Sequence, residues 1–323
     1  MFLLELIRGI IAYLIMFYSL IIPTFNRLPI LKKCLKAFEN QKIVSPEING
    51  FEIILIDDAS TDGTPEWFKS QYGSDSRFRL LEQTENKGRS HTRNFGIANA
   101  KGDMIMFVDS DIVVCDSFIE AHYQSFAKAR EKFKTDRFYT VGPEVQTADF
   151  ENPIKENYKI APFSDLFITC NASMPKYLLE ECGGFDEDFT LYGYEDIEIG
   201  IRLNKARVKG VKAEAAVGFH YHPAFSLADI PNLIKIEEQK AKMALIFCKK
   251  YPSLQIRLLV QFNLFHRILR TALALNGLIN DKTLMPLLKF LIAKKKNVLA
   301  KKILKIYLNW YYVRELYKLA YRQ

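Results

Sequence analysis

Carboxylates follow two apolar runs in the first third of the chain. Asp57 and Asp58 end one run, and Asp109 and Asp111 follow another as an Asp-x-Asp turn. Two adjacent carboxylates at the end of a buried strand are costly unless they bind something. Oxygen ligands in a short turn suit Mg²⁺ or Mn²⁺, which take few carboxylates and share the remaining positions with substrate phosphates. An Asp-x-Asp alone is common, but its place after an apolar strand, well beyond the first pair, favours a metal and phosphate site.

Basic residues open a predicted helix between these two acidic pairs. The segment Asn86-Lys87-Gly88-Arg89 is followed by Arg93, about one helical turn further on. Charged donors near the ends of strands suit a phosphate or a nucleotide. Each arginine could equally well lie on an exposed helix face.

A second group of candidates lies later in the chain. Glu195 and Asp196 crowd the start of a predicted helix, where they could do acid–base chemistry or simply complement the helix dipole. His220 and His222 end a predicted strand. A neutral imidazole there could complete a metal site, or either ring could pack beside neighbouring aromatic side chains. The sequence does not choose between the two histidines.

The elements expected to position these residues alternate between short strands and helices of about ten residues. Apolar runs predict strands at 18–22, 51–56, 78–81 and 103–108, and helical spacing predicts helices at 29–40, 64–71 and 89–100. Further strand candidates are 138–145 and 211–219, and the polar segment 146–165 between them could be a substrate loop. This alternation predicts a parallel sheet covered on both faces, which binds ligands beyond the carboxyl ends of its strands.

The character of the sequence changes near residue 228. From there on, apolar residues mixed with lysines predict three or four amphipathic helices, broken at Pro252, 276–280 and Pro286. Charged and polar residues within 254–275 argue against a membrane span there. We therefore expect three parts, which are an N-terminal apolar extension (1–15), a catalytic domain (16–227) and a basic helical C-terminal region (228–323).

Charge is divided unevenly between these parts. The net charge of the chain is +8, but residues 231–323 carry 19 lysines and arginines against four acidic residues, whereas residues 1–230 carry 26 against 33. A basic tail indicates an anionic partner. Within the predicted helix 298–311, Lys301, Lys302 and Lys305 share one arc, which suits an anionic inner-leaflet surface. The alternative is that this helix packs on the protein with its lysines solvated. No motif supports binding of nucleic acid.

The class of protein is limited by the composition, the cysteines and the N-terminal segment. A chain that is 49% hydrophobic and 25% charged is not disordered or low in complexity. Five cysteines without Cys-x-x-Cys spacing predict free thiols in a reducing cytosol, with Cys115 and Cys248 buried. Glu5 and Arg8 interrupt the first apolar run, so we expect a surface-lying helix there instead of a span or a secretory signal, unless Met16 is the true start. The expected location is cytoplasmic, with peripheral contact at the inner face of the membrane.

Taken together, the order and spacing of these segments resemble the inverting family 2 glycosyltransferases with the GT-A fold, over residues 18–223. The family's PTxN turn is matched by Pro23, Thr24 and Asn26, with Phe25 in place of the commoner Tyr. Its remaining motifs are matched by Asp57–Thr64, by Asn86, Gly88, Arg93, Asn94 and Gly96 with Thr92 in place of Ala, by Asp109 and Asp111, and by Gly183–Glu187 with Glu195 and Asp196.

The resemblance implies a Rossmann-like, mostly parallel sheet flanked by helices, here with a helical C-terminal extension. It also implies a metal-dependent enzyme that moves a sugar from a nucleotide diphosphate, by default a UDP-sugar, to an acceptor hydroxyl in surface polysaccharide or glycolipid assembly. Asp196 inherits the role of catalytic base, and Glu195 could orient the acceptor or the donor sugar. The residues implied in binding the nucleotide sugar are Pro23, Thr24, Asn26, Asp57, Asp58, Arg89, Arg93, Asp109 and Gly184. Those implied in holding Mn²⁺ or Mg²⁺ are Asp109, Asp111, His220 and His222.

Two other functions fit the same residues. One is a non-catalytic relative that binds sugar nucleotides or serves as a scaffold, although the intact Asp58, Asp111 and Asp196 argue against it. The other is a polyprenyl-phosphate glycosyltransferase, which would better suit a chain with clear C-terminal membrane spans.

Overall fold

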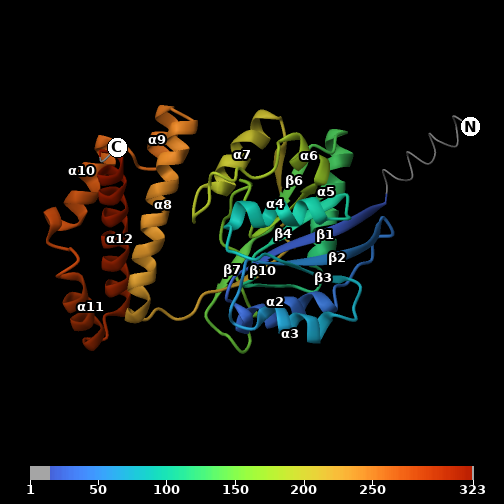
Figure 1. The fold of residues 1–323 in the computed structure, drawn as a ribbon, viewed down its shortest axis with the longest axis horizontal. Helices are drawn as coiled ribbons and strands as arrows, with labels where there is room; N and C mark the ends of the chain where they lie inside the picture. The colour runs from blue at the N-terminus through green and yellow to red at the C-terminus, as the bar shows by residue number, and fades with distance from the viewer. Residues whose placement is uncertain (1–14, 322–323) are drawn as a thin grey trace, which may run out of the picture. The chain divides into compact units, whose positions relative to one another are not determined.

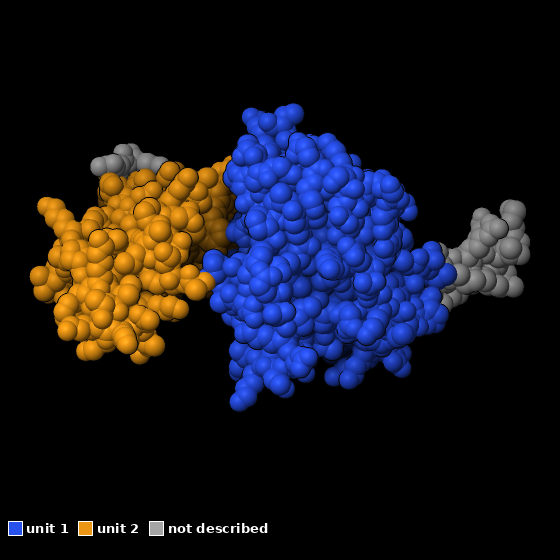
Figure 2. All heavy atoms as spheres, turned by 90° about the horizontal axis from the view of Figure 1, so that it is seen from below, with its two compact units in different colours: residues 1–187, 195–223 blue, residues 188–194, 224–323 orange. Residues whose placement is uncertain are grey.

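The computed structural model describes residues 15–321, which form two compact units (Figures 1 and 2). The first unit contains the chain up to Glu187 together with Glu195–Pro223, and the second contains Asp188–Tyr194 together with the chain from Ala224. The short segment 188–194 therefore belongs with the C-terminal helices although it lies within the sequence of the first unit. The surface-lying helix expected near the N-terminus falls outside the described residues.

The first unit is built on a seven-stranded sheet with the order β3-β2-β1-β4-β8-β6-β9. The strands are β1 (Met16–Thr24), β2 (Ile48–Asp57), β3 (Phe78–Glu82), β4 (Met104–Val108), β6 (Phe138–Val141), β8 (Asn171–Pro175) and β9 (Lys209–Lys212). Strand β8 runs antiparallel to both of its neighbours, and the other pairs are parallel. The mostly parallel sheet flanked by helices confirms the expected fold class, and the four strands expected before residue 110 are all present.

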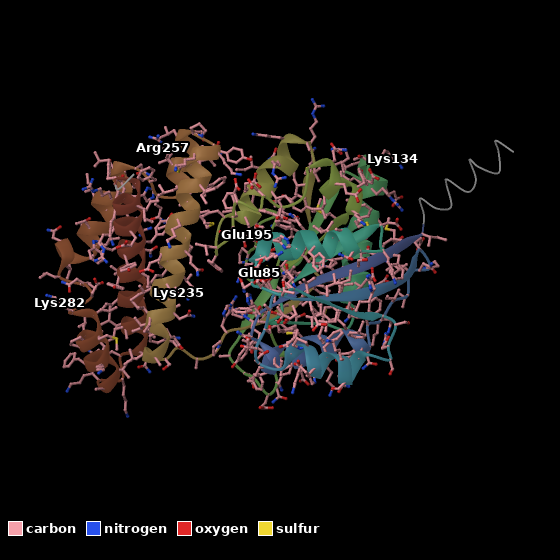
Figure 3. All side chains as sticks on the ribbon, viewed as in Figure 1. Glu85, Lys134, Glu195, Lys235, Arg257 and Lys282 are labelled. Carbon is pink, nitrogen blue, oxygen red and sulfur yellow. The ribbon has the colours of Figure 1, made fainter. Side chains whose placement is uncertain are left out.

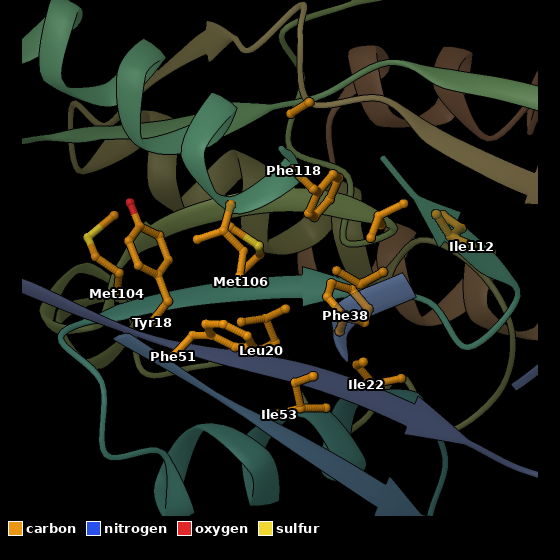
Figure 4. Packing of buried hydrophobic residues seen from close by; sticks show 14 of the residues in the cluster. Tyr18, Leu20, Ile22, Phe38, Phe51, Ile53, Met104, Met106, Ile112 and Phe118 are labelled. Atoms are coloured by element: carbon orange, nitrogen blue, oxygen red, sulfur yellow. The ribbon is translucent and has the colours of Figure 1, made fainter. Parts of the chain in front are cut away.

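Side chains alternate between the two faces of this sheet, as the two-residue period of a strand requires. Tyr18, Leu20 and Ile22 of β1 belong to one apolar core, whereas Ile21 belongs to another. The helices that cover the first face are α2 (Leu28–Glu39), α3 (Thr64–Tyr72) and α5 (Phe118–Phe133), and those on the second are α4 (Arg89–Asn99), α6 (Lys176–Glu181) and α7 (Glu195–Lys205). Figure 4 shows the first core, where Phe38 and Phe118 meet edge to face beside the β1 side chains.

A second sheet of three short strands has the order β5-β10-β7. It consists of β5 (Ile112–Val114), β7 (Glu144–Thr147) and β10 (Gly218–Tyr221), with β10 antiparallel to β5 and parallel to β7. The expected single strands 138–145 and 211–219 were therefore wrong, because each is divided between the two sheets. The chain breaks at Gly142-Pro143, where Pro143 has no N–H to donate and a Cβ on Gly142 would meet the Ala216 carbonyl oxygen at 2.2 Å.

Over its described residues the second unit is helical, with five α-helices in place of the three or four expected. They are α8 (Ile230–Lys250), α9 (Leu254–Leu259), α10 (Leu264–Leu273), α11 (Leu284–Ala293) and α12 (Asn297–Ala320), joined by the 3₁₀ turns η1 (Leu227–Asp229) and η2 (Leu275–Gly277). The break expected at Pro286 was wrong, because this proline lies in the first turn of α11, where its missing N–H costs no helical hydrogen bond. Leu288, Leu304 and Tyr307 are buried in the core of this unit.

Two further findings bear on the expectations. Among residues 15–321, no helix is both long enough and apolar enough to cross a bilayer. The five cysteines form no disulfide within the described chain, but Cys115 and Cys248 are only half-buried, and the fully buried thiols are Cys34 and Cys170. The prediction that Cys115 and Cys248 are buried was wrong, because an apolar neighbourhood in sequence does not decide which face of an element meets the core.

Candidate active site

Arg93 is the centre of an acidic cluster in the first unit. Its guanidinium lies 3.3 Å from Asp109, 3.4 Å from Glu195 and 3.6 Å from Asp196, and its side chain is only 2% exposed. It also lies over the ring of Phe185. Burial alone would lower the pKa of Arg93, but the three carboxylates hold it above its ordinary value. A buried guanidinium surrounded in this way stays charged and fixes the three acids relative to one another.

Asp196 is held from the other side by Thr169. The Thr169 hydroxyl donates to the carboxylate at 2.9 Å, and the Thr169 N–H donates to it at 3.2 Å. Burial, together with the charges of Glu195 and Asp109, raises the pKa of Asp196 to about 6, although Arg93 acts in the opposite direction. A carboxylate with fixed orientation and a pKa near neutrality is suited to accept a proton.

Glu195 comes directly before Asp196 at the start of α7, and Figure 3 labels its side chain. It is buried, and its Oε1 lies 3.4 Å from Arg93 and 3.9 Å from Arg89. The first turn of a helix favours negative charge, so α7 tolerates both acids there. Residues 89 and 93 are one turn apart on α4, and both therefore meet the same carboxylate.

A second polar group joins β10 to the turn after β4. The register of the three-stranded sheet pairs His220 with Ile112 on one side and with Gln146 on the other, which brings the histidine next to Asp111 and Glu144. His220 Nε2 lies 3.4 Å from Asp111 Oδ1, and His220 Nδ1 lies 2.6 Å from Glu144 Oε2. Asp111 also pairs with Arg27, which follows β1.

Charges within this group shift its pKa values strongly. Burial alone would raise the pKa of Asp111, but His220 and Arg27 lower it to about 2. Burial alone would lower the pKa of His220, but Asp111 and Glu144 raise it to about 10. Opposite shifts of this kind are what an ion pair between Asp111 and His220 produces.

The group fits a divalent metal in its donor chemistry. Asp111 Oδ1 is buried and accepts no hydrogen bond from any described residue, so it is an orphaned oxygen facing an imidazole nitrogen. Glu144 would fix the ring through Nδ1–H and leave Nε2 as ligand, an arrangement typical of histidines that bind metals. No cluster of three His, Cys, Asp or Glu side chains close enough to hold a metal occurs among residues 15–321. Asp111 and His220 would therefore supply two ligands and leave the other positions to substrate oxygens.

A sequence model described as glycosyl transferase family 2 matches residues 19–174, the stretch that carries β1, β2, β4 and the Asp-x-Asp turn. A second model, described as the N-terminal domain of galactosyltransferase, matches residues 154–224, which include Asp196 and His220. Over residues 19–174 the chain matches glycosyltransferase family 2. The family resemblance drawn from the sequence motifs is thereby confirmed.

Individual relatives agree with this family. The chain is 25% identical over 291 residues to the uncharacterized glycosyltransferase YfnE of Bacillus subtilis, with 73% of this chain and 71% of YfnE aligned. It is 36% identical over 106 residues to the glycosyltransferase GlyG of Streptococcus pneumoniae, where the match covers 33% of this chain and only 34% of GlyG. Activity and substrates of the whole relatives therefore do not transfer directly.

One solved structure shows the shared fold. The mannosyltransferase PcManGT from Pyrobaculum calidifontis, determined in complex with GDP-Man and Mn²⁺, superposes with a TM-score of 0.59 at 17% identity, over 96% of this chain and 88% of PcManGT. At 17% identity this structural similarity establishes the fold of the chain and does not identify its substrates.

The segment expected to bind the nucleotide lies at the ends of β1 and β2. Asn26 joins the two loops, because its N–H donates to Ser60 Oγ and its Oδ1 accepts from Thr61 N–H. Thr24 is buried, and its hydroxyl has no hydrogen-bond partner within the described chain. Pro23 precedes it in β1. Pro23, Thr24 and Asn26 stay predicted donor-binding residues, and the hydrogen bonds of Asn26 tie their segment to the loop after β2.

Asp57 and Asp58 differ in their surroundings. Asp57 accepts from Ser60 N–H at 2.9 Å, and burial raises its pKa. Asp58 accepts from the backbone N–H groups of Lys87 at 2.8 Å and Gly88 at 3.1 Å, and from Gln83. Asp58 therefore ties the loop before α4 to the end of β2, in addition to any contact it makes with a nucleotide.

Three of the predicted residues have a structural role that the sequence did not reveal. Arg93 is buried among carboxylates, so we expect it to position acids instead of facing solvent as a phosphate ligand. A Cβ on Gly184 would meet Asn94 Oδ1 at 2.7 Å, and φ is +68° there, so the glycine makes room for Asn94. The ring of His222 lies beside that of His220, tilted by 37° with centroids 4.1 Å apart, and the backbone N–H of His222 donates to the Thr147 carbonyl oxygen. His220 is thus the histidine that the fold brings to Asp111.

Sequence reasoning missed three residues of the site. Arg27, Glu144 and Thr169 contact Asp111, His220 and Asp196 respectively. Arg27 follows the PTxN turn directly, and this position was a usable signal. Glu144 and Thr169 are brought in by strand pairing and by a loop far from their partners in sequence, so the sequence held no comparable signal for them.

Proposed function

We propose that this glycosyltransferase moves a sugar from a nucleotide diphosphate to an acceptor hydroxyl with inversion, and that Asp196 is the catalytic base. The observation that carries the proposal is the pairing of Asp196 with Thr169 and Arg93, which fixes the carboxylate and leaves its pKa at about 6. A base with this pKa is ionised at neutral pH and can still take up a proton.

The proposed reaction is a single displacement. Asp196 accepts the proton of the acceptor hydroxyl as that oxygen forms a bond to the anomeric carbon of the donor. The bond from the same carbon to the diphosphate oxygen breaks, and the electron pair leaves with the nucleoside diphosphate. Attack and departure occur on opposite faces, so the anomeric configuration inverts. Arg93 keeps Asp109 and Glu195 fixed beside the base, and in this proposal Glu195 orients a hydroxyl of the acceptor or of the donor sugar.

Asp111 and His220 are the proposed ligands of a divalent cation, with Glu144 orienting the ring of His220. When bound, Mn²⁺ or Mg²⁺ would stabilise negative charge on the departing diphosphate, a contribution of several kcal/mol in comparable enzymes. Support comes from the orphaned Asp111 oxygen and from Mn²⁺ in the PcManGT structure. Asp109, which was also predicted as a ligand, is paired with Arg93, and we propose that it supports the site from there.

We propose the nucleotide base and the acceptor only as chemical classes. A UDP-sugar is the default donor, while PcManGT binds GDP-Man, so both are candidates. The acceptor proposed is a glycan or glycolipid hydroxyl, for which family membership is the support.

The test is a panel of UDP-, GDP- and dTDP-sugars incubated with the protein and Mn²⁺. We expect one donor to raise the thermal midpoint and to be consumed, with an α-linked donor giving a β-linked product by NMR. Retention of the anomeric configuration would overturn the displacement mechanism. Binding without turnover of the bound donor, across a range of acceptor sugars, would favour the non-catalytic alternative.

A further inference from the structure

Helix α10 in the second unit carries an apolar face that points away from its own unit. The face consists of Leu264, Phe265, Ile268 and Leu273 on α10, and it continues through Leu275 and Leu278 at η2. Their exposed fractions are 66%, 66%, 60%, 43%, 57% and 69%. All ten residues of α10 are at least partly exposed. At 100° per residue the four α10 members lie within one half of the helix.

The opposite half of α10 is the one that packs. Arg267 lies over the ring of Tyr317 on α12 at 4.9 Å, and Arg270 Nε donates to Gln261 Oε1 at 3.0 Å. Figure 1 shows α10 running beside α12. A surface helix of a globular protein normally turns its apolar stripe to the core and its charges to water. Here the polarity is inverted, and a face of this size calls for an occupant.

Charge identifies the chemistry of that occupant. Between Leu254 and Asn280 the sequence has three arginines and no acidic residue, and the exposed lysines 294–296, 301, 302 and 305 follow in the same unit. Figure 3 labels Arg257, which lies within this stretch, and Lys282, which follows it. An apolar face on a unit with this excess of positive charge matches a bilayer surface with anionic headgroups. A second copy of the chain fits less well, because an isologous contact would bring the same basic residues together.

Helix α12, expected from the sequence to lie on the membrane, has its apolar side occupied. Ala300, Leu304, Tyr307 and Tyr311 are buried in the core that α12 shares with α8 and α11. Apart from Val298 and Leu299 in its first turn, α12 mainly offers exposed lysines to a lipid surface, and these contribute electrostatic attraction without insertion.

We propose that the α10–η2 face inserts into the headgroup region of an anionic membrane, while the exposed lysines of the second unit contact the headgroups. The helix lies in the plane of the interface, since ten residues are too few to cross a bilayer of about 30 Å. The inference is independent of the proposed reaction, because lipid binding is measured without turnover.

The test is flotation of the full chain with vesicles of phosphatidylglycerol and phosphatidylcholine, and with vesicles of phosphatidylcholine alone. We expect the wild type to float with the anionic vesicles and to be released by salt. The double variant Phe265→Glu/Ile268→Glu should reduce the vesicle-bound fraction of the protein about tenfold or more, because insertion of the α10–η2 face would then bury two carboxylates in the membrane interface. The matched control is Val44→Glu/Phe133→Glu, which changes two exposed apolar residues of the first unit and should float like the wild type.

Lys301→Glu/Lys302→Glu should weaken flotation at low salt and have little effect at high salt. Thermal midpoints and gel filtration of each variant show that folding and oligomeric state are preserved. A wild type that does not float with anionic vesicles at low salt would overturn the proposal, as would unchanged flotation of Phe265→Glu/Ile268→Glu. A dimer that this variant dissociates, without flotation of the wild type, would assign the face to a second copy instead.

Discussion

His220 Nδ1 lies 2.6 Å from Glu144 Oε2, so the imidazole is held by a carboxylate on its neighbouring strand. This contact turns Nε2 towards Asp111. Glu144 and His220 lie far apart in sequence, and the pairing of β7 with β10 brings them together.

Removing Glu144 should weaken the proposed metal site without removing a ligand. We expect Glu144→Gln to lower the affinity for Mn²⁺ by about 10- to 100-fold, since the ring of His220 loses its fixed orientation and basicity. Asp111→Ala should abolish the dependence of nucleotide diphosphate binding on Mn²⁺. His222→Gln should change either quantity only slightly. Calorimetry with and without Mn²⁺ measures all three, and equal affinity of wild type and Asp111→Ala would contradict the assignment.

Activity should fall on the acidic side of neutrality. A base acts when ionised, and burial raises the pKa of Asp196 from 3.8 to about 6, so kcat/KM should be half-maximal near pH 6 and level at higher pH. Thr169→Val removes a hydrogen bond to the ionised carboxylate of Asp196, which should raise its pKa further. The acidic limb of the pH–rate profile should therefore move to higher pH. A rate profile that is flat between pH 5 and pH 8 in both proteins would argue that Asp196 is not the base.

Stability should also fall in acid, because of a histidine outside the site. Burial lowers the pKa of His122 from 6.5 to about 4. The unfolded chain therefore binds a proton that the folded chain does not between these values, and stability present above pH 6.5 is lost as the pH falls towards 4. From pH 7 to pH 5 this loss amounts to about 2 kcal/mol.

Urea unfolding at pH 7 and pH 5 measures this loss. The matched variant is His122→Gln, which can still hydrogen-bond Thr140 or Asn171 but does not titrate. Its free energy of unfolding should change less between the two pH values than that of the wild type. An identical change in both proteins would assign the acid sensitivity to other groups.

Gly183 and Gly184 offer a matched pair of substitutions. Both have positive φ, +76° and +68°, so alanine is strained by about 1 kcal/mol or more at either position. At Gly184 the new Cβ would also meet Asn94 Oδ1 at 2.7 Å, whereas at Gly183 no described atom lies within 4 Å. Gly184→Ala should therefore lower the thermal midpoint more than Gly183→Ala. Equal midpoints would show that Asn94 moves away at no cost.

The parts of the fold that are periodic in sequence could be predicted. The run 51–56 is apolar on both faces of β2 except at Glu52, and α2 repeats its apolar residues at helical spacing. The boundaries of both elements therefore differ from expectation by only a few residues. The strands at 138–145 and 211–219 could not be resolved, because an apolar run does not reveal a change of sheet in its middle.

The candidate site, like the fold, could be predicted from the sequence only in part. The acids at strand ends were identifiable because parallel strands bring their carboxyl ends to one edge. Arg93 was predicted to bind the nucleotide sugar, and only the structure revealed that it is buried beside Asp109, Glu195 and Asp196. The inverted polarity of α10 was also invisible, since periodicity identifies an apolar face but not what it packs against.

The most direct test is the transfer rate of Asp196→Asn compared with Asp103→Asn. Asp103 is an exposed carboxylate that precedes β4, at the end of the strand away from Asp109, so it controls for the loss of a charge. With donor binding and thermal midpoint preserved in both variants, we expect Asp196→Asn to lose at least about 10²-fold in kcat and Asp103→Asn to stay near wild type. Near-wild-type turnover by Asp196→Asn would contradict the assignment of the catalytic base.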